Sequence, residues 1–198
     1  MNIRHIISLI SSILFVVAGL WYVIDIAKSK VKPNVASFVV YSFTNASLFA
    51  SLIVKHVWVA VPLGGISTLS SLAVVALCFR TKYFHFSLAD KIAFGAGLVG
   101  LVLWVVTKNA SYNVYILAVL NTVVFAPITI KALKHPDLET VLPWRLNLVA
   151  SLFLVLAVPS FTLLQLVIPI QQLVCSGPLN LALMRGEILS RRQRLKQS

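Results

Sequence analysis

Long apolar runs, separated by short stretches rich in lysine, arginine, proline or asparagine, make up most of the chain. A membrane-spanning helix needs about 20 mostly apolar residues, and the polar stretches leave seven runs near that length. We therefore predict seven transmembrane helices, at residues 6–27, 35–54, 57–79, 88–107, 111–133, 141–158 and 161–184. Only Pro159 and Ser160 separate the last two runs. Fused, these runs would be too long for one crossing and would contain a helix-breaking proline.

The composition supports lipid as the solvent for this chain. Hydrophobic residues make up 59% of the sequence and charged residues 11%, and the mean hydropathy is +0.94. A soluble globule of this size could not hide so much apolar surface. The polar stretches are too short to form a soluble domain, so we predict a single membrane domain over residues 1–198.

The formal net charge of +12 comes from basic residues that flank the apolar runs rather than from one basic face. That distribution indicates membrane topology and no nucleic-acid partner. Lysine and arginine are retained on the cytoplasmic side of short loops. An outside N-terminus leaves only Arg4, Lys55 and Lys108 outside, among 17 basic residues. We therefore expect a multi-pass protein of the cell inner membrane, with its N-terminus outside and its C-terminus in the cytoplasm.

An internal repeat relates the first three predicted helices to the last three. At an offset of about 106 residues, Asp25 falls opposite Lys131 and Lys28 opposite Lys134; at 107, Pro62 falls opposite Pro169. A single helix between the halves gives both the same orientation. The predicted divisions are a first triple-helix repeat at 1–80, a linker helix at 81–108, a second repeat at 109–185 and a basic cytoplasmic tail at 186–198.

This 3+1+3 arrangement resembles the SWEET and PQ-loop family, which joins two parallel triple-helix bundles through an inverting fourth helix. The segments 22–34 and 125–134, with Ser37 and Phe38, look like the family's Pro-Gln loop, its basic turn and its entry into the next helix. Nearly the whole chain also resembles seven-helix bacterial membrane proteins of the same type, through Asp25 to Pro33, Leu103-Trp104 and Asn180. The resemblance implies an all-α transporter fold. That closer resemblance implies no particular activity.

Two departures from the family pattern bear on the substrate. Sugar transporters of the family carry an asparagine directly after the proline of helices three and seven, where this sequence has Leu63 and Ile170. The glutamine of the Pro-Gln pair is also missing from both halves. The resemblance therefore implies the fold without implying sugar as the substrate.

Few ionisable side chains are available for chemistry within the predicted spans. All five acidic residues lie at predicted cytoplasmic ends beside lysine or arginine, where charge pairing at the interface is expected. The histidines are scattered, and Cys78 and Cys175 fall in apolar runs. We therefore predict no catalytic residues, no metal site and no cofactor, and movement of a solute that is not coupled to a carboxylate.

Neutral polar side chains near mid-membrane are the candidates for a solute pocket, and they could equally hydrogen-bond between helices. They are Asn45, Ser67, Thr68, Asn121, Asn147, Ser151, Gln171 and Gln172. Gln171 and Gln172 are favoured because they follow a proline that would open the helix. Prolines within predicted spans can act as hinges or simply pack, and they are Pro62, Pro127 and Pro169.

Two functions follow from these patterns. The repeat and the paired polar positions favour a transporter that passes a small neutral or zwitterionic solute by alternating access. The alternative is a membrane scaffold that binds a partner through its basic cytoplasmic face, which could equally contact anionic lipid. A homo-oligomer is compatible with either function.

Overall fold

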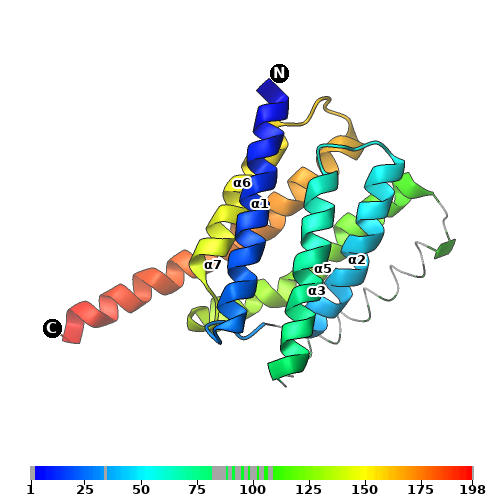
Figure 1. The fold of residues 1–198 in the computed structure, drawn as a ribbon. Coiled ribbons are helices and arrows are strands. Elements are labelled where there is room, and N and C mark those ends of the chain that lie inside the picture. The colour runs from blue at the N-terminus through cyan, green and yellow to red at the C-terminus, as the bar shows by residue number, and fades with distance from the viewer. Residues whose placement is uncertain are drawn as a thin grey trace.

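The computed structural model describes residues 3–33, 35–81 and 109–197, with isolated positions at 88, 91, 95, 98, 102, 105 and 106. Regular structure in these parts of the chain is helical throughout (Figure 1). The elements are α1 (Ile3–Ala27), α2 (Val35–Val54), α3 (Val61–Thr81), α5 (Ala110–Lys134), the short 3-10 helix η1 (Pro136–Leu138), α6 (Val141–Leu156) and α7 (Leu163–Gln197). The predicted fourth helix, 88–107, lies outside the described residues except at the isolated positions.

The lengths and exposed faces of the helices indicate a multi-pass membrane protein. Five helices, α1, α2, α3, α5 and α7, are long and apolar enough to cross a bilayer, whereas α6 has 16 residues. On α1 the buried positions, such as Phe15, Ala18 and Tyr22, recur every three or four residues, which gives the helix one inward face. Its opposite face exposes Leu9, Ile13 and other large apolar side chains, as expected for a surface solvated by lipid.

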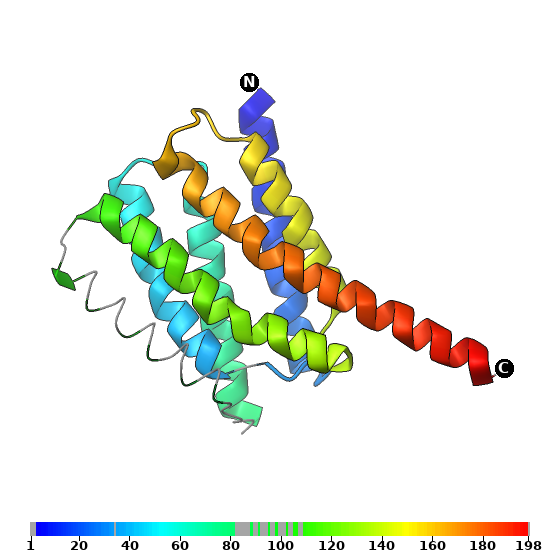
Figure 2. The same cartoon turned by 180° about the vertical axis from the view of Figure 1, so that it is seen from behind.

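The six long helices close a ring. α1 contacts α3 and α6, α2 contacts α3 and α5, and α7 contacts α5 and α6. The order around the ring is therefore α1, α3, α2, α5, α7, α6, which the front and back views let the reader follow (Figures 1 and 2). Within each half of the chain, the third helix lies between the first and the second.

The loops gather at the two ends of the ring. The N-terminus lies at the end that carries the α2–α3 and α6–α7 loops, and the α1–α2 and α5–α6 loops lie at the other end (Figure 1). Each end has its own hydrophobic cluster. One contains Leu52, Val57 and Val114, near the first end. The other contains Ile26, Val31 and Ala132, near the second.

Two helices end in the same tight turn. Ser29 and His56, which follow α1 and α2, have φ angles of 57° and 54°, in the left-handed region. Lys30 N donates to Asp25 O at 2.9 Å and Ser29 N to Ile26 O at 2.8 Å, which is the hydrogen-bond pattern of a Schellman turn. The non-glycine residue in this conformation reverses the chain immediately after the helix.

Two helix boundaries differ most from the sequence-based expectation. The seventh helix does not end near Met184, because α7 continues to Gln197 and projects away from the other helices (Figure 2). Arginine, glutamate, leucine and lysine in this region favour helix, so the charge marks the edge of the apolar run without ending the helix. α3 begins at Val61 rather than near residue 57, because the turn after α2 continues through that segment.

Candidate functional site

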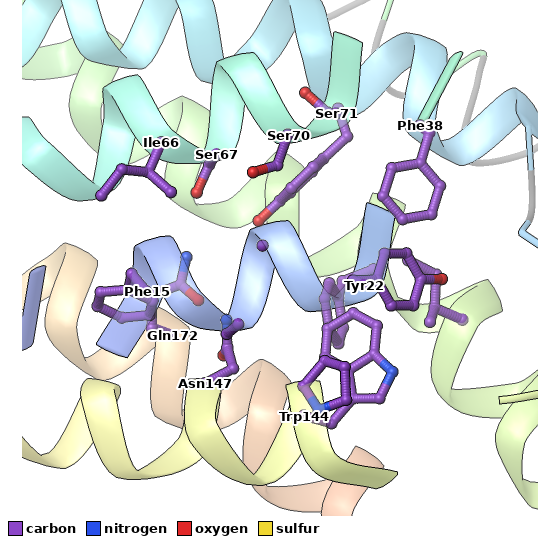
Figure 3. A pocket seen from close by; sticks show the side chains of 16 residues that line it. Phe15, Tyr22, Phe38, Ile66, Ser67, Ser70, Ser71, Trp144, Asn147 and Gln172 are labelled. Carbon is purple, nitrogen blue, oxygen red and sulfur yellow. The ribbon is translucent and has the colours of Figure 1, made fainter. Parts of the chain in front are cut away.

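A cavity lies inside the ring, and all six long helices contribute to its walls. It leaves about 80 Å³ open to the centres of water-sized molecules, which is room for several waters or one small solute. Phe15 and Ile66 lie toward one end of the cavity, and Phe38, Tyr22 and Trp144 toward the other (Figure 3).

Polar side chains face the cavity from two sides. Ser67, Ser70 and Ser71 lie on α3, and their spacing of three and four residues places them on one face of that helix. Asn147 of α6 and Gln172 of α7 lie on the opposite side of the cavity (Figure 3). The hydroxyl and amide groups on these walls can donate and accept hydrogen bonds without carrying charge.

Five aromatic rings close one end of the cavity, and we call them the aromatic collar: Tyr22, Phe38, Tyr41, Phe125 and Trp144. The ring centroids of Tyr22 and Trp144 are 5.2 Å apart, and those of Phe125 and Trp144 are 5.5 Å apart. Tyr22 stacks on Phe38 at 5.8 Å. These separations are typical of favourable aromatic contacts. The collar belongs mainly to the hydrophobic cluster near the α1–α2 and α5–α6 loops.

Three of the eight predicted pocket residues, Ser67, Asn147 and Gln172, line the cavity. Asn45 and Asn121 do not. Asn121 donates to Asn45 Oδ1 at 3.5 Å, between α5 and α2, and Asn45 donates to the Tyr41 carbonyl at 2.7 Å. This buried pair forms the interhelical contact that was the alternative to solute binding.

The other three predicted residues satisfy groups on their own helices. Thr68 donates to the Gly64 carbonyl and Ser151 to the Asn147 carbonyl, both at 2.7 Å. Gln171, which the sequence favoured, is buried and donates to Cys175 Sγ at 3.0 Å. Its Oε1 atom has no hydrogen-bond partner among the described residues. Adjacent positions on a helix point about 100° apart, and only Gln172 of the pair lines the cavity.

The predicted hinge prolines divide into two kinds. Pro127 lies inside α5 and Pro169 inside α7, so each interrupts the hydrogen bonding of a long helix. Pro62 lies within the candidate span Val61–Phe79, but it is the second residue of α3, where no backbone hydrogen bond is lost. α7 contains a further proline, Pro178.

A buried pair of charged side chains lies beneath the collar, at residues for which we expected charge pairing at the membrane interface. Lys131 Nζ and Glu139 Oε1 are 2.6 Å apart, and the Glu139 side chain is 1% exposed. Two cavity-lining residues donate to Glu139 Oε2, Tyr22 through its hydroxyl at 3.4 Å and Trp144 through Nε1 at 3.3 Å. Lys131 also donates to the carbonyl of Lys32 in the α1–α2 loop. Glu139 thus joins both halves of the chain.

Burial raises the pKa of the Glu139 carboxyl above its ordinary value. The Lys131 charge and the hydrogen bonds from Lys131, Trp144 and Tyr22 lower that pKa without cancelling the effect of burial. One sequence signal pointed to this site. In each half, a charged residue near the end of the first helix is followed by an opposite charge in the next loop.

The other acidic residues of the described chain are Asp25, Asp137 and Glu187. Asp25 of α1 pairs at 3.6 Å with Lys30, which lies in the α1–α2 loop, the counterpart of the α5–α6 loop that contains Glu139. Arg145 pairs with Glu187 at 2.6 Å. Charge pairing was therefore correctly expected for these residues, although the Asp25 and Glu139 side chains are buried rather than interfacial. Asp137 is exposed. Asp90 lies outside the described residues.

The described part of the chain contains no group of three histidine, cysteine or acidic side chains placed to hold a metal ion. Cys78 and Cys175 are buried, and neither forms a disulfide. The cavity walls combine aromatic rings, hydroxyls and amides, an arrangement that can bind a small neutral molecule by stacking and hydrogen bonding. Comparisons of the chain with protein-family models, with curated proteins and with solved structures find no match.

Proposed function

We propose that this protein is a small membrane transporter of the SWEET and PQ-loop type, which moves a small neutral or zwitterionic solute by alternating access. The observation that carries the proposal is the cavity at the centre of the ring, to which all six long helices contribute. A binding site shared by every helix changes shape when either half of the ring moves relative to the other. Such a site suits a transporter better than a purely structural bundle.

The chemistry of the cavity walls supports the solute class. Among the described residues that line the cavity, none is an aspartate, glutamate, lysine, arginine or histidine. An ion with a net charge would lose its hydration there without gaining a counter-charge. The desolvation of a buried, unpaired ion costs on the order of several kcal/mol. A neutral solute instead exchanges water for the serine, asparagine and glutamine side chains.

The order of helices around the ring supports the 3+1+3 organisation. The third helix of each half lies between the other two, and the junctions α2–α5 and α6–α1 are equivalent under the repeat. Seven spans would complete this organisation, with a fourth helix joining two parallel bundles. The basic α1–α2 and α5–α6 loops lie at the same end of the ring, which supports an outside N-terminus in the cell inner membrane.

The aromatic collar is the proposed cytoplasmic gate. Its rings come from α1, α2, α5 and α6, so they belong to both halves and must separate when that end opens. Pro127 and Pro169 lie inside α5 and α7. The backbone hydrogen bonds missing at these prolines allow the two helices to bend during such a movement.

Solute flux into proteoliposomes tests the proposal. The purified protein is offered a panel of labelled sugars, polyols and amino acids, and uptake is compared with that of empty vesicles. We expect saturable uptake of at least one neutral or zwitterionic compound. If no compound in the panel is taken up, while the protein remains folded and each compound also fails to shift its thermal unfolding, the transporter proposal is wrong.

One observation favours a second function. α7 extends beyond the other helices and carries the basic residues near the C-terminus on a projecting helix (Figure 2). A projecting basic helix can bind an acidic partner protein at the cytoplasmic surface. Removing residues 186–198 discriminates the two functions, because a scaffold would lose its partner in co-purification while a transporter would retain its flux.

A further inference from the structure

The carboxylate of Glu139 lies directly behind the cytoplasmic gate and is bonded to it. Tyr22 and Trp144 both belong to the aromatic collar, and both donate to the same oxygen, Glu139 Oε2. The other oxygen bonds to Lys131, which also holds the Lys32 carbonyl. The collar cannot open fully without breaking some of these bonds and exposing Glu139 to water.

We infer that Glu139 is a proton-binding site, and that its occupancy by a proton controls whether the cytoplasmic end of the cavity is closed or open. The control of this gate deepens the proposed transport function and rests on it, whereas proton binding itself does not. The expectation from the sequence, that no carboxylate takes part, is thereby revised.

The direction of the effect follows from linkage. In the closed state, burial raises the pKa of the Glu139 carboxyl. Opening hydrates the group and returns its pKa toward the ordinary glutamate value of about 4.3. The closed state therefore binds the proton more tightly, so a fall in pH through the raised pKa favours closure. At pH values above the raised pKa, both states are ionised and closure gains nothing from the proton.

Tyr22 connects this site to the cavity. Tyr22 lines the cavity and donates to Glu139 through its hydroxyl, which offers a proton a route from cavity water to the carboxylate while the gate stays closed. In that step, the Tyr22 O–H proton moves to Glu139 Oε2 as the phenol oxygen takes a proton from a hydronium ion. The phenol is restored, one water molecule is released and the carboxylate becomes a carboxylic acid.

Other titratable groups lie near Glu139. Tyr22 and Lys131 are its direct partners, and Cys78 on α3 faces Lys131. Further charged or titratable groups on the packed elements are Asp25, Lys30 and Lys32 around the α1–α2 loop, Lys134, His135 and Asp137 on α5 and η1, and the Arg145–Glu187 pair between α6 and α7. Of these, Asp25 alone is a second buried carboxylate, and it pairs with Lys30.

A cysteine reporter in the cavity tests the inference without knowledge of the solute. Cys78 and Cys175 are replaced by alanine, and Ser67→Cys is labelled with a membrane-impermeant thiol reagent from the cytoplasmic side. Ser190→Cys, exposed on α7, corrects for the effect of pH on thiol reactivity. The corrected labelling rate should fall about fivefold or more between mildly alkaline and mildly acidic pH, which is the lower range of coupling between protein sites.

The glutamine side chain of the Glu139→Gln variant cannot take up a proton, and it is neutral like a protonated Glu139. In the reporter protein it should give slow labelling that does not change with pH, whereas Asp137→Asn, in the same loop but exposed, should leave the pH dependence intact. The inference is overturned if Glu139→Gln retains the pH dependence of its parent, or if the reporter is never labelled from the cytoplasm.

A second measurement needs no cysteine reporter, in case the reporter variants do not fold. Infrared difference spectra of the wild type minus Glu139→Gln should show a carboxyl group that titrates above the ordinary glutamate range. No such difference would also overturn the inference. If the carboxyl titrates as expected but no solute is ever transported, the proton site stands and the transport proposal fails. If solute is transported but neither its flux nor the cysteine labelling depends on Glu139, the transport proposal stands and the proton-site inference fails.

Discussion

At the scale of single residues, the cavity depends on which face of a helix a polar side chain occupies. Gln171 and Gln172 are adjacent and chemically identical, yet only Gln172 lines the cavity. Gln171 donates to Cys175 Sγ on its own helix, whereas Gln172 lies in the cavity wall.

The two glutamines therefore provide a matched pair of variants. Gln172→Leu should raise the KM for the transported solute about fivefold to tenfold, because one lost hydrogen bond costs about 1 kcal/mol. Gln171→Leu should leave KM within about twofold, since it replaces a buried amide whose oxygen has no partner in the described structure. Initial rates of uptake across solute concentrations give both values. Equal effects from the two variants would contradict the assignment of the cavity wall.

The same scale shows what the sequence could and could not predict. Three of the eight predicted neutral polar residues line the cavity. Which of them do so depends on how each helix is rotated about its axis. Asn45 and Asn121 are far apart in sequence and meet only because α2 and α5 are neighbours. Glu139 was overlooked because its burial is produced by Tyr22 and Trp144, which approach it from other elements.

At the scale of elements, hydrophobic patterning predicted the helices well. The second helix was predicted at residues 35–54, as observed, because charged and polar residues flank its apolar run. The end of α7 was not predicted, since a run of charges limits the membrane-embedded part of a helix but not its hydrogen bonding. The fourth span stays a prediction.

Close packing between α2 and α3 depends on glycine. A Cβ atom at Gly64 would lie 3.2 Å from the Cα of Phe49, and the backbone there cannot move without shifting α2. At Gly65, the nearest contact would be the end of the Phe49 ring at 3.3 Å, and a ring can turn aside.

We accordingly expect Gly64→Ala to lower the stability of the protein by about 1–3 kcal/mol through overpacking. Gly65→Ala should be close to neutral, because alanine favours helix over glycine by about 1 kcal/mol and offsets a small shift of the ring. Thermal unfolding in detergent, followed by circular dichroism, measures both. A lower melting temperature for Gly65→Ala than for Gly64→Ala would count against this packing.

At the scale of the whole molecule, the ring has two chemically different ends. The end with the α1–α2 and α5–α6 loops collects most of the basic residues of the described loops, whereas the other end carries Arg4 and Lys55. Under the rule that basic loops stay inside, this difference predicts the proposed orientation, with the N-terminus outside.

Labelling of single cysteines in intact cells checks that orientation. Ser160→Cys, exposed in the α6–α7 loop, should react with an impermeant thiol reagent added outside, and Ser190→Cys should react only after the cells are permeabilised. Both variants are made without Cys78 and Cys175, so that each carries a single thiol. The opposite pattern would reverse the topology and place the aromatic collar at the outer end.

The two halves of the chain carry opposite charges at equivalent positions, and this difference bears on the number of protons that closure involves. Lys131 occupies the position that Asp25 holds in the first half, and at the same offset Glu139 falls opposite Pro33, which has no side chain that can titrate. In a dimer of identical halves, equivalent positions must be the same residue, so any such carboxylate would occur twice. Two halves within one chain escape that constraint, and Glu139 pairs with Lys131 in the second half only. We expect the proposed closure to involve one proton rather than two, with a Hill coefficient near one in its pH dependence.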